Sequence, residues 1–221
     1  MAPRIGVVLF PGSNCEHDVA EAVDAMGGRA EILWHGSPEL GGVDAVVIPG
    51  GFAHGDYLRP GAIARFSPVM EAVGSFAADG GPVVGICNGF QVLTEAGLLP
   101  GALQKNAGLK FLCRSTTLRV ETTSTPLTTA AALGAELRIP INHFEGNYTC
   151  DPETLAELRA EDRVVVRYVE NPNGSTDDIA GICNAGRNVV GLMPHPERAY
   201  HELLGSTDGQ CLIRSVIEAA A

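Results

Sequence analysis

Four short, mostly apolar runs in the first 90 residues constrain the fold of this chain more than any other feature. They cover 5–10, 30–34, 45–48 and 82–87. Continuous rather than alternating apolar strands are typical of a parallel sheet whose two faces are both covered. Apolar residues at helical spacing follow the first and last runs and end at Gly27-Gly28 and Gly97. We therefore expect four strand-then-helix units joined by right-handed crossovers.

The second half of the chain has a different hydrophobic pattern. Segments 116–122, 136–141 and 164–169 are alternating and partly Thr-rich, which predicts antiparallel or mixed strands with one solvated face. A short helix is expected over 152–160, and a hairpin should join 179–183 to 189–193. The sequence contains no segment typical of a linker, so we expect one α/β domain over 1–221. This domain should have a mostly parallel sheet that is flanked by helices and extended by antiparallel strands.

Composition excludes several classes of function. Fifteen basic and 26 acidic residues give a net charge of −11, which argues against nucleic acid or an anionic membrane as the main partner. No run approaches a membrane span of about 18 apolar residues and no secretory signal precedes the first run, so a cytoplasmic location is expected. Six cysteines without a Cys-x-x-Cys pair fit neither a zinc cage nor a disulfide scaffold. No phosphate-binding loop motif occurs, so no nucleotide site is predicted.

One cysteine occupies a predicted strand-to-helix turn. Cys87 follows an apolar strand, precedes a helical pattern, and has Gly85 and Gly89 two residues to either side. Small residues at this spacing permit the strained turn known as a nucleophile elbow. The turn places the thiol at the amino end of a helix, whose dipole favours a thiolate. Taken alone, the motif fits a buried structural cysteine equally well.

A histidine and a glutamate near the C-terminus supply candidate partners for that thiol. Pro196 disfavours helical geometry at His195, and residues two apart in an extended segment point to the same side. His195 and Glu197 are therefore expected to face one direction, with the carboxylate fixing the imidazole tautomer. An isolated His-x-Glu is more often a solvated turn, but together with the elbow it favours a Cys87-His195-Glu197 triad.

Acyl chemistry also needs hydrogen-bond donors for an oxyanion. The backbone N–H of Asn88 and the Gly50-Gly51 pair at the end of the third run are the candidates. For Pro49-Gly50-Gly51 alone, a plain strand-ending turn is the simpler interpretation.

The other cysteines and the histidines carry weaker signals. Gly181–Asn184 repeats Gly85–Asn88 letter for letter, but a strand follows it, so Cys183 is interpreted as hairpin packing. Cys15 lies near a helix start close to His17 and is a second candidate reactive thiol. The remaining thiols, Cys113, Cys150 and Cys211, are expected to be buried or incidental. The histidines at 17, 54 and 143 lack metal-ligand spacing, so no metal is predicted.

Taken together, these motifs resemble a known family. Gly85–Gln91 with His195–Glu197 resembles the class I (triad) glutamine amidotransferases, which have a flavodoxin-like fold. The runs 11–18, 49–64 and 191–198 narrow the resemblance to the glutaminase subunits of phosphoribosylformylglycinamidine synthase, in purine biosynthesis. The resemblance spans nearly the whole chain.

The resemblance implies a mechanism and a set of site residues. Cys87 is implied to attack the side-chain amide of glutamine, giving a glutamyl thioester and ammonia, while His195 moves the proton and Glu197 orients it. The family also implies residues that bind the oxyanion, Gly51 and Asn88, and residues that contact the substrate, Gln91, Gly50, Phe52, His143 and Phe144.

The same resemblance implies partners. Ammonia would pass to a large synthetase subunit (PurL type), which uses ATP and Mg²⁺ to convert formylglycinamide ribonucleotide to the amidine, and a small third subunit (PurS type) would help to join the two. No cofactor is expected in this chain. The sequence departs from the family pattern at Ala53-His54, where Ser-Tyr is common, and at Phe144, where a smaller residue is more usual.

Three alternatives remain open at this point. An elbow-cysteine peptidase or deglycase of related fold also uses such a cysteine. The chain could instead be the glutaminase subunit of another amidotransferase, or a non-catalytic module that retains the fold.

Overall fold

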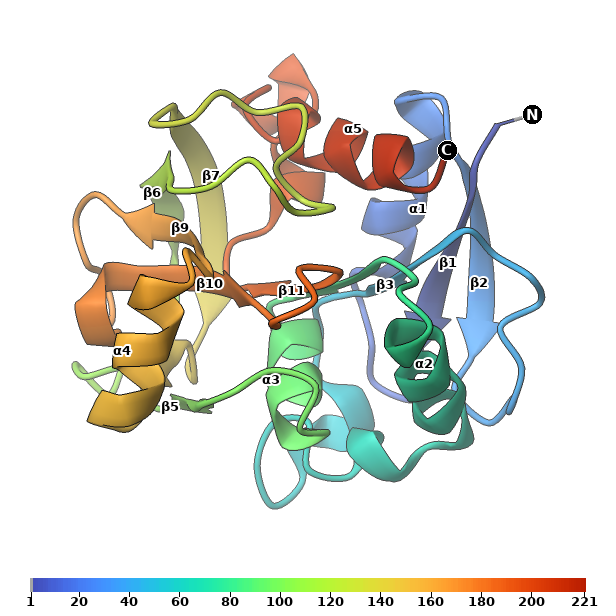
Figure 1. The fold of residues 1–221 in the computed structure, drawn as a ribbon, viewed down its shortest axis with the longest axis horizontal. Coiled ribbons are helices and arrows are strands. Elements are labelled where there is room, and N and C mark those ends of the chain that lie inside the picture. Colours follow the sequence, from blue (N-terminus) through green and yellow to red (C-terminus); the bar gives the residue numbers. More distant parts are fainter. Residues whose placement is uncertain (1) are drawn as a thin grey trace.

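A nine-stranded mixed sheet forms the centre of the molecule in the computed structural model, which describes residues 2–221 (Figure 1). Five neighbouring strands are parallel and four more continue the sheet in antiparallel pairs. In spatial order the strands are β2 (Arg29–Trp34), β1 (Arg4–Leu9), β3 (Ala45–Ile48), β4 (Val83–Ile86), β11 (Val189–Leu192), β10 (Ile179–Cys183), β9 (Val164–Tyr168), β6 (Leu112–Val120) and β7 (Glu136–His143). This confirms the predicted α/β class and the added antiparallel strands.

Helices cover both faces of the parallel part. Figure 1 shows α1 (Glu16–Ala25) and α5 (Gln210–Ala219) on one side of the sheet, and α2 (Pro68–Ala78) and α3 (Asn88–Glu95) on the other. Strands β3, β4 and β11 lie between these layers and are buried along their whole length, as continuous apolar runs predict. Among residues 2–221, no helix is long and apolar enough to cross a membrane.

Smaller elements complete the chain. A separate two-stranded ladder, β5 (Ala102–Gln104) with β8 (Asn147–Thr149), lies beside α4 (Pro152–Ala160). The part of the chain that the structure describes also contains five short 3₁₀ helices. Asp151 caps α4, because its carboxylate accepts a hydrogen bond from the Thr154 N–H at 2.8 Å and Pro152 follows at the first helical position. The 3₁₀ helices are η1 (Ala53–Asp56), η2 (Ala64–Phe66), η3 (Thr176–Asp178), η4 (Pro196–Arg198) and η5 (Glu202–Leu204).

Two details of the predicted strand-helix repeat are wrong. Residues 35–44, which the structure describes and which connect β2 to β3, contain no helix, because Pro38 and the left-handed Gly41-Gly42 pair (φ 66° and 69°) make the connection a series of turns. Strand β2 is also not buried on both faces. It is the edge strand of the sheet, and Ile32 and Trp34 are 41% and 52% exposed.

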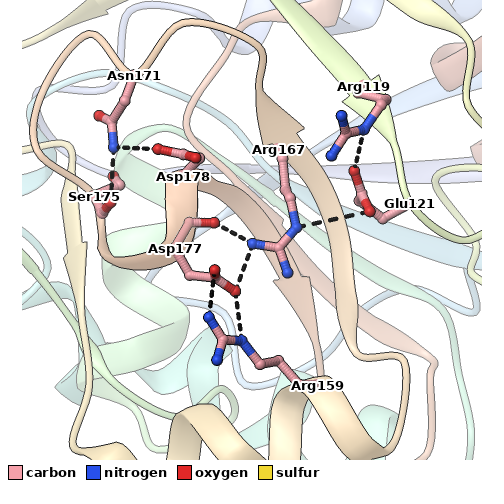
Figure 2. Close-up of polar contacts among 8 residues, drawn as sticks. All are labelled: Arg119, Glu121, Arg159, Arg167, Asn171, Ser175, Asp177 and Asp178. Atoms are coloured by element: carbon pink, nitrogen blue, oxygen red, sulfur yellow. Dashed lines mark hydrogen bonds and ion pairs between the residues drawn. The ribbon is translucent and has the colours of Figure 1, made fainter.

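A network of ion pairs ties α4 to the antiparallel strands (Figure 2). The Asp177 carboxylate accepts hydrogen bonds from both Arg159 on α4 and Arg167 on β9, and Arg167 also reaches Glu121 after β6. The hydrogen bonds from Arg159, followed by those from Arg167, lower the pKa of Asp177 in spite of partial burial. This network fixes one side of the antiparallel region.

Candidate active site

Cys87 lies at a strained turn between β4 and α3. Its backbone has φ 50° and ψ −103°, a conformation that side-chain-bearing residues rarely adopt, and its N–H donates to the Leu192 carbonyl at 2.7 Å. A Cβ on Gly89 would overlap the Ile48 carbonyl oxygen, and one on Gly85 would lie 2.7 Å from the Gly89 carbonyl oxygen. Both glycines are therefore required by close packing against the neighbouring backbone, which is the geometry expected of a nucleophile elbow.

His195 and Glu197 form a buried pair at the end of β11. The His195 Nδ1 and Glu197 Oε1 atoms are 2.7 Å apart, both residues are 1% exposed, and the His195 N–H donates to the Pro140 carbonyl at 2.9 Å. Burial is the largest single influence on the His195 pKa and lowers it, but the charges of Glu197 and Cys87 outweigh burial and hold the pKa well above its ordinary value. The imidazole is therefore poised to carry a positive charge beside the thiol.

The thiol and the imidazole open into one cavity, here called the catalytic cavity. Of the predicted site residues, Cys87, His195, Gly51, Phe52, Gln91, His143 and Phe144 line it, together with Asn14, Cys15, Asp56, Phe111, Asn142 and Glu145. Gly50 lies instead behind the imidazole, where an added Cβ would come within 2.6 Å of His195 Cε1. Gly50 thus allows the histidine ring to pack closely against the end of β3.

The Asn88 side chain connects three segments around this cavity. Its Oδ1 accepts from the Ala53 N–H at 3.0 Å, and its Nδ2 donates to Asp56 at 3.0 Å and to the Gln91 side chain at 2.9 Å. Gln91 in turn donates to the Glu145 carbonyl at 2.5 Å. These bonds link η1, α3 and the loop after β7, so the residue that follows the nucleophile also sets the shape of the cavity.

His143 contributes a neutral imidazole to the cavity wall. Its Nδ1 is 3.1 Å from the side-chain oxygen of Asn106, while its Nε2 is buried without a hydrogen-bond partner in the described chain. Burial, followed by the positive charge of His195, lowers the pKa of His143 to about 4. His143 is consequently uncharged at neutral pH.

A second thiol lies beside the histidine. Cys15 is buried, accepts a hydrogen bond from Arg198 at 3.1 Å, and has its Sγ within 4.8 Å of ligand-type atoms of His195 and Glu197. His17, its neighbour in sequence, has a side chain that is 83% exposed. A metal at this position would need the His195 Nδ1 and Glu197 Oε1 atoms as ligands. These two atoms are already joined by a hydrogen bond, so the cluster does not argue for a metal.

The cysteine expected to be a decoy is remote from this chemistry. Cys183 is fully buried in β10, followed by the turn that leads into β11, as predicted. Burial raises the pKa of the Cys183 thiol, which keeps it protonated and unreactive. Of the other thiols, Cys113 is exposed and Cys150 and Cys211 are partly buried.

A larger cavity of about 500 Å³ also adjoins the histidine-glutamate pair. It shares His195 and Asn142 with the catalytic cavity but does not include Cys87. It is lined by charged residues of both signs, among them Asp18, Glu21, Arg114 and Arg198. We assign the chemistry to the catalytic cavity because only that cavity contains the nucleophile.

Sequence reasoning missed several residues of the catalytic cavity. Asp56 at the end of η1 and Glu145 in the loop after β7 have no characteristic spacing. Asn142, on β7, has its carbonyl oxygen 3.8 Å from the Cys87 sulfur. Asp56 does fall within the 49–64 run that carried the family resemblance, but nothing in that run marks its side chain as facing the nucleophile. Cys15 was noticed, although for its proximity to His17 rather than to His195.

The site combines an elbow cysteine with a buried histidine-glutamate pair on a mostly parallel sheet, which defines a triad glutamine amidotransferase domain. The family model of the CobB/CobQ-like glutamine amidotransferase domain matches residues 2–210. A phosphoribosylformylglycinamidine synthase subunit PurQ from Rubrobacter xylanophilus is 60% identical over 217 residues, 98% of this chain and 99% of the relative. Another, from Koribacter versatilis, is 55% identical over 99% of both chains. The chain belongs to the PurQ family of glutamine amidotransferase subunits.

A solved structure agrees with this assignment. The chain matches a subunit in the structure of PurLQS from Thermotoga maritima with a TM-score of 0.91 and 42% identity, covering 99% of each chain. At that level of similarity the two chains share one fold. The findings favour an amidotransferase over the peptidase, the deglycase and the subunit of a different amidotransferase.

Proposed function

We propose that this chain is the glutaminase subunit of a phosphoribosylformylglycinamidine synthase, with Cys87 as nucleophile, His195 as general base and acid, and Glu197 as the group that orients and charges the histidine. The observation that carries the proposal is the buried 2.7 Å contact between His195 and Glu197, with the histidine and Cys87 opening into one cavity. The Nε2 atom of His195 has no hydrogen-bond partner among residues 2–221, which leaves it available for proton transfer.

The reaction proceeds in two acyl-transfer steps. The Cys87 sulfur attacks the side-chain amide carbon of glutamine, and His195 takes up the thiol proton and then donates it to the departing nitrogen, which leaves as ammonia. Water, deprotonated by His195, then attacks the thioester and releases glutamate and the free thiol. In both steps the negative charge on the carbonyl oxygen is stabilised by the backbone N–H groups of Gly51 and Asn88.

The remaining candidate contacts form the walls around the substrate. Phe52 and Phe144 supply apolar surface, whereas Gln91 and His143 supply polar groups that line the cavity. Gly50 acts on the reaction through the histidine ring, against which it packs. Ala53 and His54, which depart from the usual family pattern, lie in η1 between Phe52 and Asp56, which line the cavity.

The ammonia is used by partner subunits rather than by this chain. We propose a synthetase subunit of the PurL type, which binds ATP and Mg²⁺ and converts formylglycinamide ribonucleotide to the amidine, and a small subunit of the PurS type. The naming of the Thermotoga maritima complex as PurLQS supports this assembly. De novo purine synthesis then places the complex in the cytoplasm.

Replacing the nucleophile tests the proposal. In a complex reconstituted with the synthetase and small subunits, Cys87→Ser is expected to abolish glutamine-dependent synthesis while added ammonia still supports it. Cys113→Ser, a change at an exposed thiol outside the catalytic cavity, is the matched control and should leave both activities intact. Retention of glutamine-dependent synthesis by Cys87→Ser would contradict the assignment.

A further inference from the structure

Two carboxylates without an ion-pair partner face the catalytic cavity. Asp56 and Glu145 both line it, and in residues 2–221 neither forms a salt bridge with a basic side chain. Among the described residues 2–221, no lysine or arginine lines the cavity, and the basic groups that line it are His143 and His195. A cavity of this composition favours a ligand that brings its own positive charge.

Asp56 is held in place by the turn it occupies and by Asn88. Its backbone adopts φ 51°, a left-handed conformation that costs free energy in a residue other than glycine, and Asn88 Nδ2 donates to its carboxylate at 3.0 Å. Asn88 is itself fixed by the Ala53 N–H and the Gln91 side chain. The carboxylate is therefore positioned in advance, at one end of a hydrogen-bond chain that begins at the residue following the nucleophile.

The catalytic cavity is a poor environment for the charge on Asp56. Burial is the main influence and raises the pKa of Asp56 to about 6, against the hydrogen bond from Asn88, and the nearby charge of Glu145 adds to the rise. A cation bound between the two carboxylates would stabilise the ionised form. Glutamine carries such a cation, its α-ammonium group, on the carbon three bonds from the amide carbon that Cys87 attacks.

We propose that Asp56, assisted by Glu145, binds the α-ammonium group of glutamine and thereby selects a free α-amino acid over other primary amides. This assignment rests on the proposed glutaminase function and makes Asp56 a specificity-determining residue. The ammonium group would complete the ion pairing that both carboxylates lack in this structure. It would also align the substrate along the cavity, with the amide over Cys87 and the α-carbon towards η1.

A substrate that lacks only the α-amino group tests the assignment. Glutaramic acid has the same amide, chain length and carboxylate as glutamine. In the reconstituted complex, the Asp56→Asn variant is expected to lower kcat/KM for glutamine about 10- to 100-fold, mainly through KM, and to leave kcat/KM for glutaramic acid unchanged. Glu145→Gln should produce a smaller change of the same kind, and Asp79→Asn, at the exposed end of α2, should change neither substrate.

A chemical measurement separates this effect from misfolding. Iodoacetamide carries no ammonium group, so Cys87 in Asp56→Asn should react with it at the wild-type rate, while protection of Cys87 by glutamine should require a 10- to 100-fold higher glutamine concentration. Equal losses for glutamine and glutaramic acid, or unchanged discrimination between them, would overturn the role of Asp56. Failure of the wild-type complex to hydrolyse glutamine would overturn the proposed function, and with it this assignment.

Discussion

Removing the charge of Glu197 should cost this chain most of its glutaminase rate. The Glu197 Oε1 and His195 Nδ1 atoms are 2.7 Å apart and both residues are almost completely buried, so solvent screens the pair weakly. With charge centres about 4 Å apart and an effective dielectric constant of about 20, the interaction of a carboxylate with an imidazolium is worth about 4 kcal/mol. If the transition state carries the imidazolium, Glu197→Gln should lower kcat about 1000-fold.

The assay for Glu197→Gln is glutamate release by the reconstituted complex at saturating glutamine, with Glu202→Gln on the exposed η5 as the matched control. Because Glu197 holds the pKa of His195 well above its ordinary value, the variant should also have a lower His195 pKa in an NMR titration. Ammonia-dependent synthesis should be unchanged. A variant that keeps more than a tenth of the wild-type kcat would refute the reasoning.

Three further predictions follow from the geometry. The Asp56 carboxyl faces Glu145 and the Asn88 amide, and burial raises its pKa to about 6. The value of kcat/KM for glutamine should therefore fall as the pH decreases through about 6, and a pH profile of Asp56→Asn should lack this fall. Gly89→Ala should lower the free energy of unfolding by about 3 kcal/mol in denaturant titrations, since its Cβ would overlap a carbonyl of β3; a change below about 0.5 kcal/mol would contradict this packing. Asp177→Asn should cost about 1 kcal/mol at neutral pH, and because the pKa of Asp177 is lowered in the folded state, that difference should vanish as the pH falls from about 4 through the lowered value.

The elements that the sequence predicts best are those with a single physical cause. Continuous apolar runs correctly predict β3 and β4, because burial on both faces leaves no position for a polar side chain. The same pattern misleads at β2, where the run lies at the edge of the sheet and its outer side chains are exposed. Unlike β3 and β4, β2 contains a charged residue within the run, Glu31, which forms an ion pair with Arg4 and indicates a less buried strand.

The site follows the same division. The elbow at Cys87 and the local His195–Glu197 pair are encoded over a few residues, so glycine spacing and alternation suffice to find them. The position of Cys15 depends on a contact with Arg198, 183 residues away, which no local pattern predicts. Local sequence patterns also do not predict the place of Asp56 in the site, because its orientation is set by a left-handed turn and by a hydrogen bond from a different element.

The central claim is that Cys87 forms the acyl-enzyme, and trapping that intermediate tests it most directly. The reconstituted complex, mixed with radiolabelled glutamine and quenched in acid, should yield a glutamyl adduct on the peptide that contains Cys87 and none in Cys87→Ser. Cys15 lines the same cavity beside His195, so it provides a demanding internal comparison. An adduct on Cys15, or steady glutamine turnover with no adduct on Cys87, would contradict the account.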